Sequence, residues 1–123
     1  MSETMRTLRV ERGSVGRVEL AYSHYIGGGQ SEAKGYTVHW QPDNTKGEWE
    51  QFVPFGELPA GFKPSPGDPV FVLTNSSGGL VWAVVIDETI CFNTSMEDEA
   101  LLELARNPHA QTGTILPEPP LEG

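Results

Sequence analysis

The sequence predicts a mainly β protein: a small antiparallel barrel of about five to six strands, followed by one C-terminal helix. The main evidence lies between Pro69 and Asp87, where the apolar runs PVFVLT and LVWAVVID are separated only by NSSGG, as is typical of a β-hairpin. Both faces of the two runs are apolar, so we expect this hairpin to be buried on both sides. The 14 Gly and 10 Pro in 123 residues suit short strands joined by turns.

The chain before this hairpin alternates between apolar and polar residues in several short stretches. The alternation predicts strands over residues 6–11, 15–25, 36–40 and 49–55. Residues 56–68 contain too many Pro and Gly for regular structure and have room for one short 3₁₀ turn. Short strands, and a Pro-Gly loop before the last pair, favour an SH3-like barrel over an OB-fold.

The period changes after the hairpin. Thr94 and Glu97 have the spacing of a capping box, and apolar residues then recur at helical spacing until Pro108. We therefore expect a helix over 95–106, one domain over 1–107, and a tail over 108–123 that is extended or disordered because it has little to bury.

Charge and composition exclude several classes of function. The formal net charge is −9, and residues 87–123 hold eight acids and one base. A field of this sign repels phosphate backbones, so direct nucleic-acid binding is not expected, and basic partners are favoured. The sequence contains no apolar run long enough for a membrane span, and the single cysteine, Cys91, excludes an internal disulfide framework. A cytoplasmic protein without membrane contact is the expectation.

The sequence offers no catalytic or metal-binding motif. His24 and His39 lie on consecutive predicted strands, but a zinc site would need two more ligands that the sequence does not place nearby. Cys91 lies in an apolar ICF run, which favours a buried, inert thiol. We therefore expect no enzyme, no cofactor and no metal.

Two segments resemble a known family. YTVHW followed by WEQFVPFGEL resembles the Y-x-V-H-aromatic … W-x-x-aromatic-V-P-x-x-x-L signature of chromo-barrel and Tudor-like domains. PGDPVFV…GGLVWAVVID is similar to the opening hairpin of Tudor-like barrels, in permuted order. The resemblance implies a peptide-binding barrel in which Trp40, Trp49 and Phe52 form a cage for a methylated lysine or arginine, with Phe52 where the signature usually has Trp.

Acidity and aromatic content together predict an interaction protein, an inhibitor or adaptor that docks on a basic surface of a protein partner. The alternative is a barrel that binds a small ligand or modified peptide through its aromatic patch. The candidate binding residues are Tyr22, Tyr25, Trp40, Trp49, Phe52 and Phe55. Homo-oligomerisation through an exposed edge strand over 6–11 is a further possibility.

Overall fold

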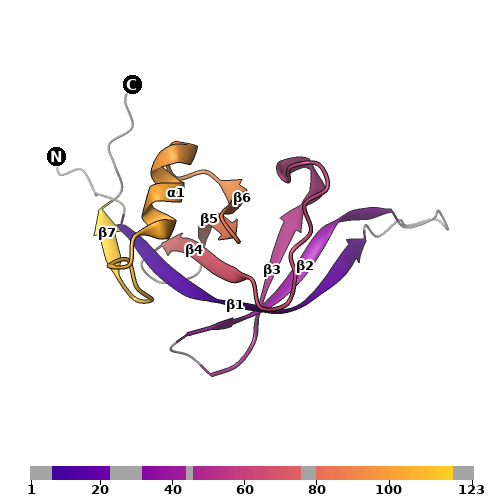
Figure 1. Cartoon of the computed structure of the whole chain (residues 1–123), viewed down its shortest axis with the longest axis horizontal. Coiled ribbons are helices and arrows are strands. Elements are labelled where there is room, and N and C mark those ends of the chain that lie inside the picture. Colours follow the sequence, from indigo (N-terminus) through magenta and orange to yellow (C-terminus); the bar gives the residue numbers. More distant parts are fainter. Residues whose placement is uncertain (1–6, 23–31, 44–45, 76–79, 118–123) are drawn as a thin grey trace.

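A computed structural model describes residues 7–22, 32–43, 46–75 and 80–117 (Figure 1). The described chain is mainly β: six antiparallel strands form one sheet that curls into a half-barrel, in the order β3-β2-β1-β4-β5-β6, and a seventh strand, β7, pairs with β1. The elements are β1 (Thr7–Tyr22), β2 (Ala33–Pro42), β3 (Trp49–Pro54), the 3₁₀ turn η1 (Phe55–Glu57), β4 (Pro69–Asn75), β5 (Val81–Ile86), β6 (Thr89–Asn93), α1 (Asp98–Arg106) and β7 (Ile115–Pro117). The predicted fold class, mainly β with a C-terminal helix, is confirmed.

Strand β1 belongs to both halves of the sheet because it changes partner along its length. Residues 8–14 pair with β4, and residues 13–22 pair with β2. The change occurs at Gly13, where an added Cβ would lie 2.0 Å from the carbonyl oxygen of Gln41. Only glycine allows the two strands to approach so closely at this crossing.

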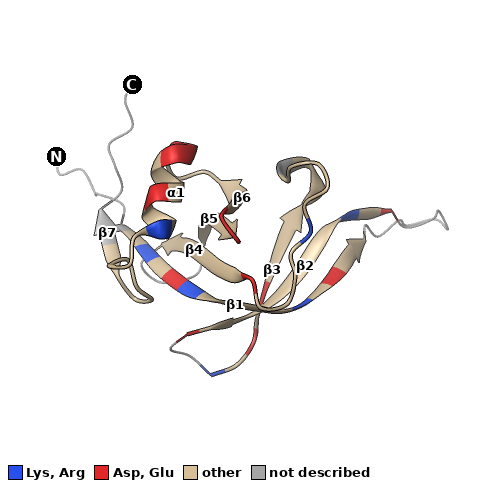
Figure 2. Ribbon diagram, in the orientation of Figure 1, with Lys and Arg blue, Asp and Glu red and all other residues tan. Residues whose placement is uncertain are grey.

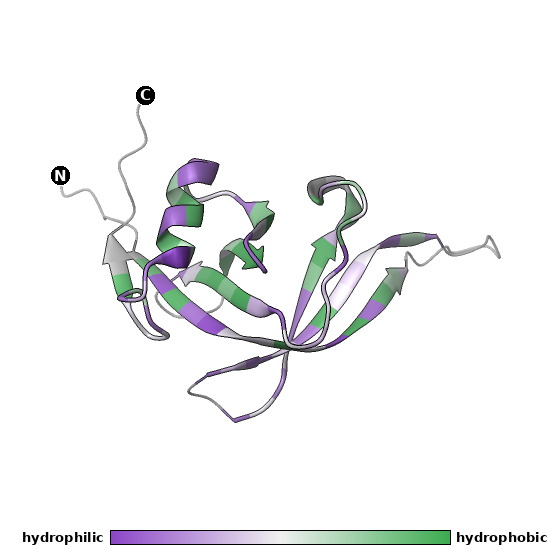
Figure 3. Cartoon of the chain, viewed as in Figure 1, coloured by the Kyte–Doolittle hydropathy of each residue, from purple (hydrophilic) through white to green (hydrophobic). Residues whose placement is uncertain are grey.

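The predicted central hairpin is formed by β4 and β5, which pair from Val70 opposite Ile86 to Thr74 opposite Val81. Both of its faces are buried, as expected, and each contributes to a separate core. Figure 3 shows that the ribbon of β4 is coloured largely as hydrophobic. The first core contains Val15, Val38, Trp40, Val53, Val70, Val72, Val84, Ile86 and Cys91. The second core contains Leu8, Val10, Phe71, Leu73, Ala83, Val85, Leu101 and Ala110.

The tryptophans differ from the sequence expectation. Trp82 lies in the hairpin that is expected to be buried on both sides, yet it is only half-buried against the second core. Trp40, a predicted cage residue, is only 1% exposed. Trp40 pairs with Val15 in the register of β1 and β2. It lies on the same face of β2 as Tyr36 and Val38, and this face packs in the first core. Its side chain therefore fills the first core.

Helix α1 begins at Asp98, so the expected start at residue 95 is wrong. The hydroxyl of Thr94 is not a helix cap, because it donates a hydrogen bond to the carbonyl of Trp82 at 2.9 Å. Asn93 instead forms a turn before the helix, and its side-chain oxygen accepts hydrogen bonds from the backbone N–H groups of Ser95 and Met96.

Beyond the expected boundary at residue 107, the chain up to residue 117 packs against the same sheet. Strand β7 pairs with β1 from Thr7 opposite Pro117 to Arg9 opposite Ile115, and Gly113 donates its N–H to the carbonyl of Val10 at 2.7 Å. Residues 118–123 lie outside the described chain. Residues 8–11 of β1 thus have β4 on one side and the 113–117 segment on the other, which leaves no free edge there for a second copy.

The half-barrel remains open between its outer strands. In the described chain β3 pairs only with β2, and β6 pairs only with β5, so these two strands end the six-stranded path, while β7 forms a further edge beside β1. Helix α1 packs through Leu101 on the second core, beside β6 (Figure 1). It is too short and too polar to cross a membrane, and no other α-helix occurs in the described ranges.

Candidate functional site

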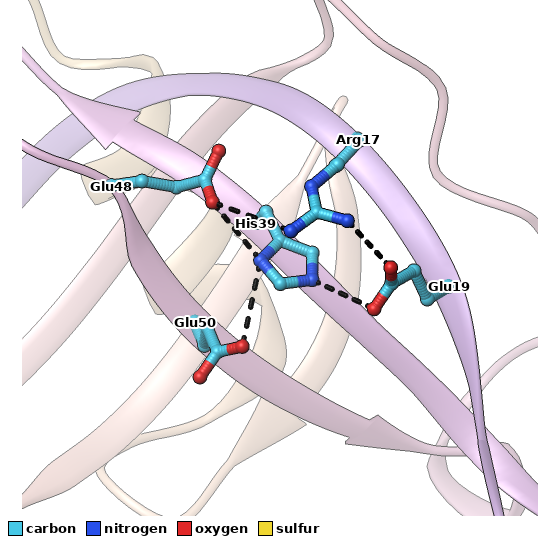
Figure 4. Close-up of polar contacts among 5 residues, drawn as sticks. All are labelled: Arg17, Glu19, His39, Glu48 and Glu50. Carbon is cyan, nitrogen blue, oxygen red and sulfur yellow. Dashed lines mark hydrogen bonds and ion pairs between the residues drawn. The ribbon is translucent and has the colours of Figure 1, made fainter.

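Strand register places charged side chains of β1, β2 and β3 on one face of the sheet, and Figure 2 marks the charged positions along the ribbon in red and blue. His39 on β2 pairs with Arg17 on β1 and with Glu50 on β3, so the three side chains point to the same side. Glu19 follows two residues after Arg17 and shares its face. We call this surface the acidic face and define it as Arg17, Glu19, His39, Glu48 and Glu50 (Figure 4).

His39 lies at the centre of the acidic face, enclosed by glutamates. Its Nε2 atom is 3.1 Å from an oxygen of Glu19, and its Nδ1 atom is 3.2 Å from Glu48 and 3.5 Å from Glu50 (Figure 4). The imidazole is only 3% exposed, whereas the three carboxylate side chains remain open to solvent. The ring therefore hydrogen-bonds to Glu19 through Nε2, while Nδ1 faces Glu48 and Glu50 without forming a hydrogen bond.

Arg17 forms ion pairs with two of these glutamates. Its guanidinium lies 2.5 Å from Glu19 and 3.8 Å from Glu48. The hydrogen bond with His39, and then the charge of Arg17, hold the pKa of Glu19 below its usual range. Three carboxylates against one guanidinium leave the face negative whether or not His39 carries a proton.

The predicted aromatic cage does not form. Phe52, 45% exposed, pairs with Thr37 and so points to the side of the acidic face. Trp49, 36% exposed, pairs with Trp40 and points to the other side, where the two indole rings meet edge to face at 5.5 Å. With Trp40 buried and the other two rings on opposite faces, these residues enclose no common space for a methylated side chain.

Of the remaining predicted site residues, the structure describes Phe55 and Tyr22, and neither contacts the charged side chains of the acidic face. Phe55 is exposed in η1 and contacts Tyr36 edge to face at 5.1 Å. Tyr36 pairs with Leu20 in the register of β1 and β2, near the end of β1 where Tyr22 is also exposed. Tyr25 lies outside the described residues.

The described chain offers no group of three or more His, Cys, Asp or Glu side chains arranged to hold a metal ion. Cys91 is buried in the first core, and burial raises the pKa of its thiol to about 12. A thiol with so high a pKa is a poor nucleophile at neutral pH. What the acidic face can do chemically is accept hydrogen bonds from cationic groups.

Comparison of the chain with protein-family models, with curated proteins and with solved structures gives no match. The site therefore rests on geometry alone. Sequence reasoning singles out His39 only as a possible zinc ligand and passes over the glutamates around it. The available signal is the two-residue spacing of Arg17 and Glu19, and of Glu48 and Glu50, because residues at that spacing share one face of a strand.

Proposed function

We propose that this protein is a non-catalytic interaction module, an inhibitor or adaptor, that docks its acidic face on a basic surface of a protein partner. The observation that carries the proposal is the gathering of three solvent-exposed carboxylates around the buried imidazole of His39, which hydrogen-bonds to Glu19 and lies within 3.5 Å of Glu48 and Glu50. Pre-positioned carboxylates lose less conformational entropy when they bind a cation than freely rotating surface glutamates do. An arginine can bind such carboxylates through two parallel hydrogen bonds.

The surroundings of the acidic face fit a protein partner. Phe52 is exposed beside it, and exposed aromatic rings are enriched at the centres of protein interfaces. The net charge of −9 opposes binding to nucleic acids and accelerates encounter with basic proteins. We infer a cytoplasmic setting, a choice that the single, buried cysteine supports.

The aromatic patch supports no second function. A binding barrel built on Trp40, Trp49 and Phe52 would need the three rings around one cavity, and Trp40 is in the core while the other two point to opposite faces. The proposed function therefore rests on the acidic face.

The proposal is tested by capture of partners from a lysate of the native host on the immobilised protein, with elution in a salt gradient. The Glu48→Gln/Glu50→Gln double variant removes two carboxylates from the acidic face. Its control is Glu99→Gln/Glu103→Gln, which removes two exposed carboxylates from α1 and gives the same net charge. We expect the first variant to release the partner at clearly lower salt than the wild type, and the control to behave as the wild type.

The captured protein is then identified by mass spectrometry, purified, and titrated against the three forms by calorimetry. Equal weakening by both double variants would mean that total charge, and not the acidic face, drives binding. Retention that is independent of salt would contradict electrostatic docking altogether.

A further inference from the structure

A cleft of about 630 Å³ lies on the open side of the half-barrel. One wall is formed by Leu58 and Pro59, just after η1, and the other by residues of β6 and α1, including Ile90, Phe92 and Leu102. Leu58 packs against the first core, on the side of β3 opposite to His39 and Glu50. The cleft is therefore a different surface from the acidic face.

The cleft runs beside a free sheet edge. Strand β6 pairs with β5 from Asn93 opposite Ala83 to Thr89 opposite Ile86. Strand β3 approaches β6, but within the described ranges no strand pairs with the other side of β6. A strand edge of this kind has backbone N–H and C=O groups directed away from the sheet. An extended peptide can satisfy these groups by adding to the sheet as a further strand.

The lining of the cleft is part apolar and part polar, and its apolar side chains are incompletely covered. Leu58, Ile90, Phe92 and Leu102 are each half-buried, so each presents part of its side chain to the cleft. The volume lies within the range of roughly 300–1,000 Å³ that is usual for ligand-binding pockets. A leucine or valine side chain entering the cleft would remove apolar surface from water on both partners.

The charges at the rim of the cleft indicate that the bound segment also carries a basic side chain. Glu88 and Asp98 both line the cleft. Glu88 is neutralised by Arg106 at 2.5 Å, whereas Asp98 accepts a hydrogen bond only from the neutral amide of Asn93, at 2.9 Å, among its described contacts. A basic side chain is thus the complement of Asp98, and an acidic one is excluded.

We propose that this cleft binds an extended peptide segment of a protein partner, which adds to the free edge of β6, seats an apolar side chain between Leu58 and Phe92, and places a Lys or Arg beside Asp98. The inference does not depend on docking through the acidic face. A partner that has both a basic surface and such a segment would engage the protein at two separate places.

The test uses two synthetic probes and the full chain labelled with ¹⁵N. The first probe is acetyl-Lys-Val-Lys-Leu-Arg-Val-Lys-amide, and the second replaces its three apolar residues with serine while keeping every charge. We expect the first probe to shift the amide resonances of β6 and of the residues around Leu58 and Leu102, and to bind at least about tenfold more tightly than the serine probe. Amide exchange along β6 should slow when the first probe is bound.

The Leu58→Ser variant should weaken binding of the first probe about tenfold, because it removes one apolar wall. Its control is Leu80→Ser, which truncates an exposed leucine outside the cleft. The resonance map of the wild type needs no variant and decides the question even if Leu58→Ser does not fold.

Equal affinities for the two probes, or shifts confined to residues of the acidic face, overturn the cleft proposal and leave the proposed function standing. Absence of binding by the first probe at millimolar concentration overturns it as well. The two proposals can also fail separately in the other direction. If the cleft binds the first probe but Glu48→Gln/Glu50→Gln leaves partner capture unchanged, the cleft proposal stands and the proposed function is refuted.

Discussion

Arg12 links β1 to the end of α1, and its replacement by methionine should destabilise the whole domain. The guanidinium donates hydrogen bonds to the carbonyls of Ala110, Asn107 (3.0 Å) and Leu104 (3.4 Å), and it lies 4.7 Å from the ring centroid of Phe71. These carbonyls belong to the last turn of α1 and the turn after it, where a cation is favoured by the helix dipole.

The magnitude follows from these contacts. A hydrogen bond from a charged donor contributes about 1.5–3 kcal/mol when buried, and a cation over an aromatic ring about 0.5–1 kcal/mol at an exposed site. Because Arg12 is only half-buried, solvent screens part of this gain. Burial also lowers the pKa of its guanidinium, and the charge of Asp43 partly offsets this effect. We expect Arg12→Met to cost about 2–3 kcal/mol in unfolding free energy and to lower the Tm by roughly 6–15 °C. Arg12→Lys should cost about 1 kcal/mol, because an ammonium keeps the charge but cannot reach several carbonyls in one plane.

The assay is urea denaturation followed by circular dichroism, with Arg106→Met as the control. Arg106 also lies at the end of α1, but its ion pair with Glu88 is exposed and should contribute less than about 0.5 kcal/mol. A cost for Arg12→Met no greater than that for Arg106→Met would refute the view that Arg12 holds α1 in place.

Three further predictions concern the core, the thiol and the acidic face. Trp40→Ala should cost about 3–5 kcal/mol in urea denaturation and Trp49→Ala about 1 kcal/mol; equal costs would contradict the burial of Trp40. With its pKa raised to about 12, Cys91 should resist iodoacetamide at pH 8 until urea unfolds the chain, and mass spectrometry would detect any native labelling. Because folding lowers the pKa of Glu19, its stabilising effect is complete above the unfolded-state value of about 4.3 and is lost as pH falls through the folded value. Glu19→Gln should therefore flatten the dependence of unfolding free energy on pH below about pH 5, and an unchanged profile would rule out this coupling with His39.

Features set by neighbouring residues were predictable from the sequence. The β4–β5 hairpin follows from two apolar runs around a short turn, and its burial on both sides follows from the apolar character of both faces. The existence of α1 follows from helical spacing, but its first residue does not. Thr94 has the right spacing to cap a helix from 95, yet the carbonyl of Trp82, on another strand, takes its hydroxyl.

Features set by distant residues were not predictable. The segment after Pro108 is too polar to indicate a packed element, and it is ordered by β1, about a hundred residues earlier in the chain. The acidic face likewise cannot be read from the linear sequence. His39 and the glutamates around it come from β1, from β2, and from β3 with the residue before it, and they meet only through the register of the sheet. Trp40 is more deeply buried than Trp82 because of which face of each strand turns toward a core. The alternation of apolar and polar residues along the strands does not decide which face that is.

The pairing of β7 with the start of β1 has a consequence for how the chain folds. Thr7 and Pro117 lie opposite each other in the register, so this contact closes nearly the whole described chain into a loop. Such contacts cost loop-closure entropy before they return any stability, and they slow folding. During synthesis β1 can pair with β2 and β4 early, but its pairing with β7 must wait until residues 115–117 leave the ribosome. Folding should thus begin in the β1–β2–β3 half and be completed at the edge where the first and last strands meet.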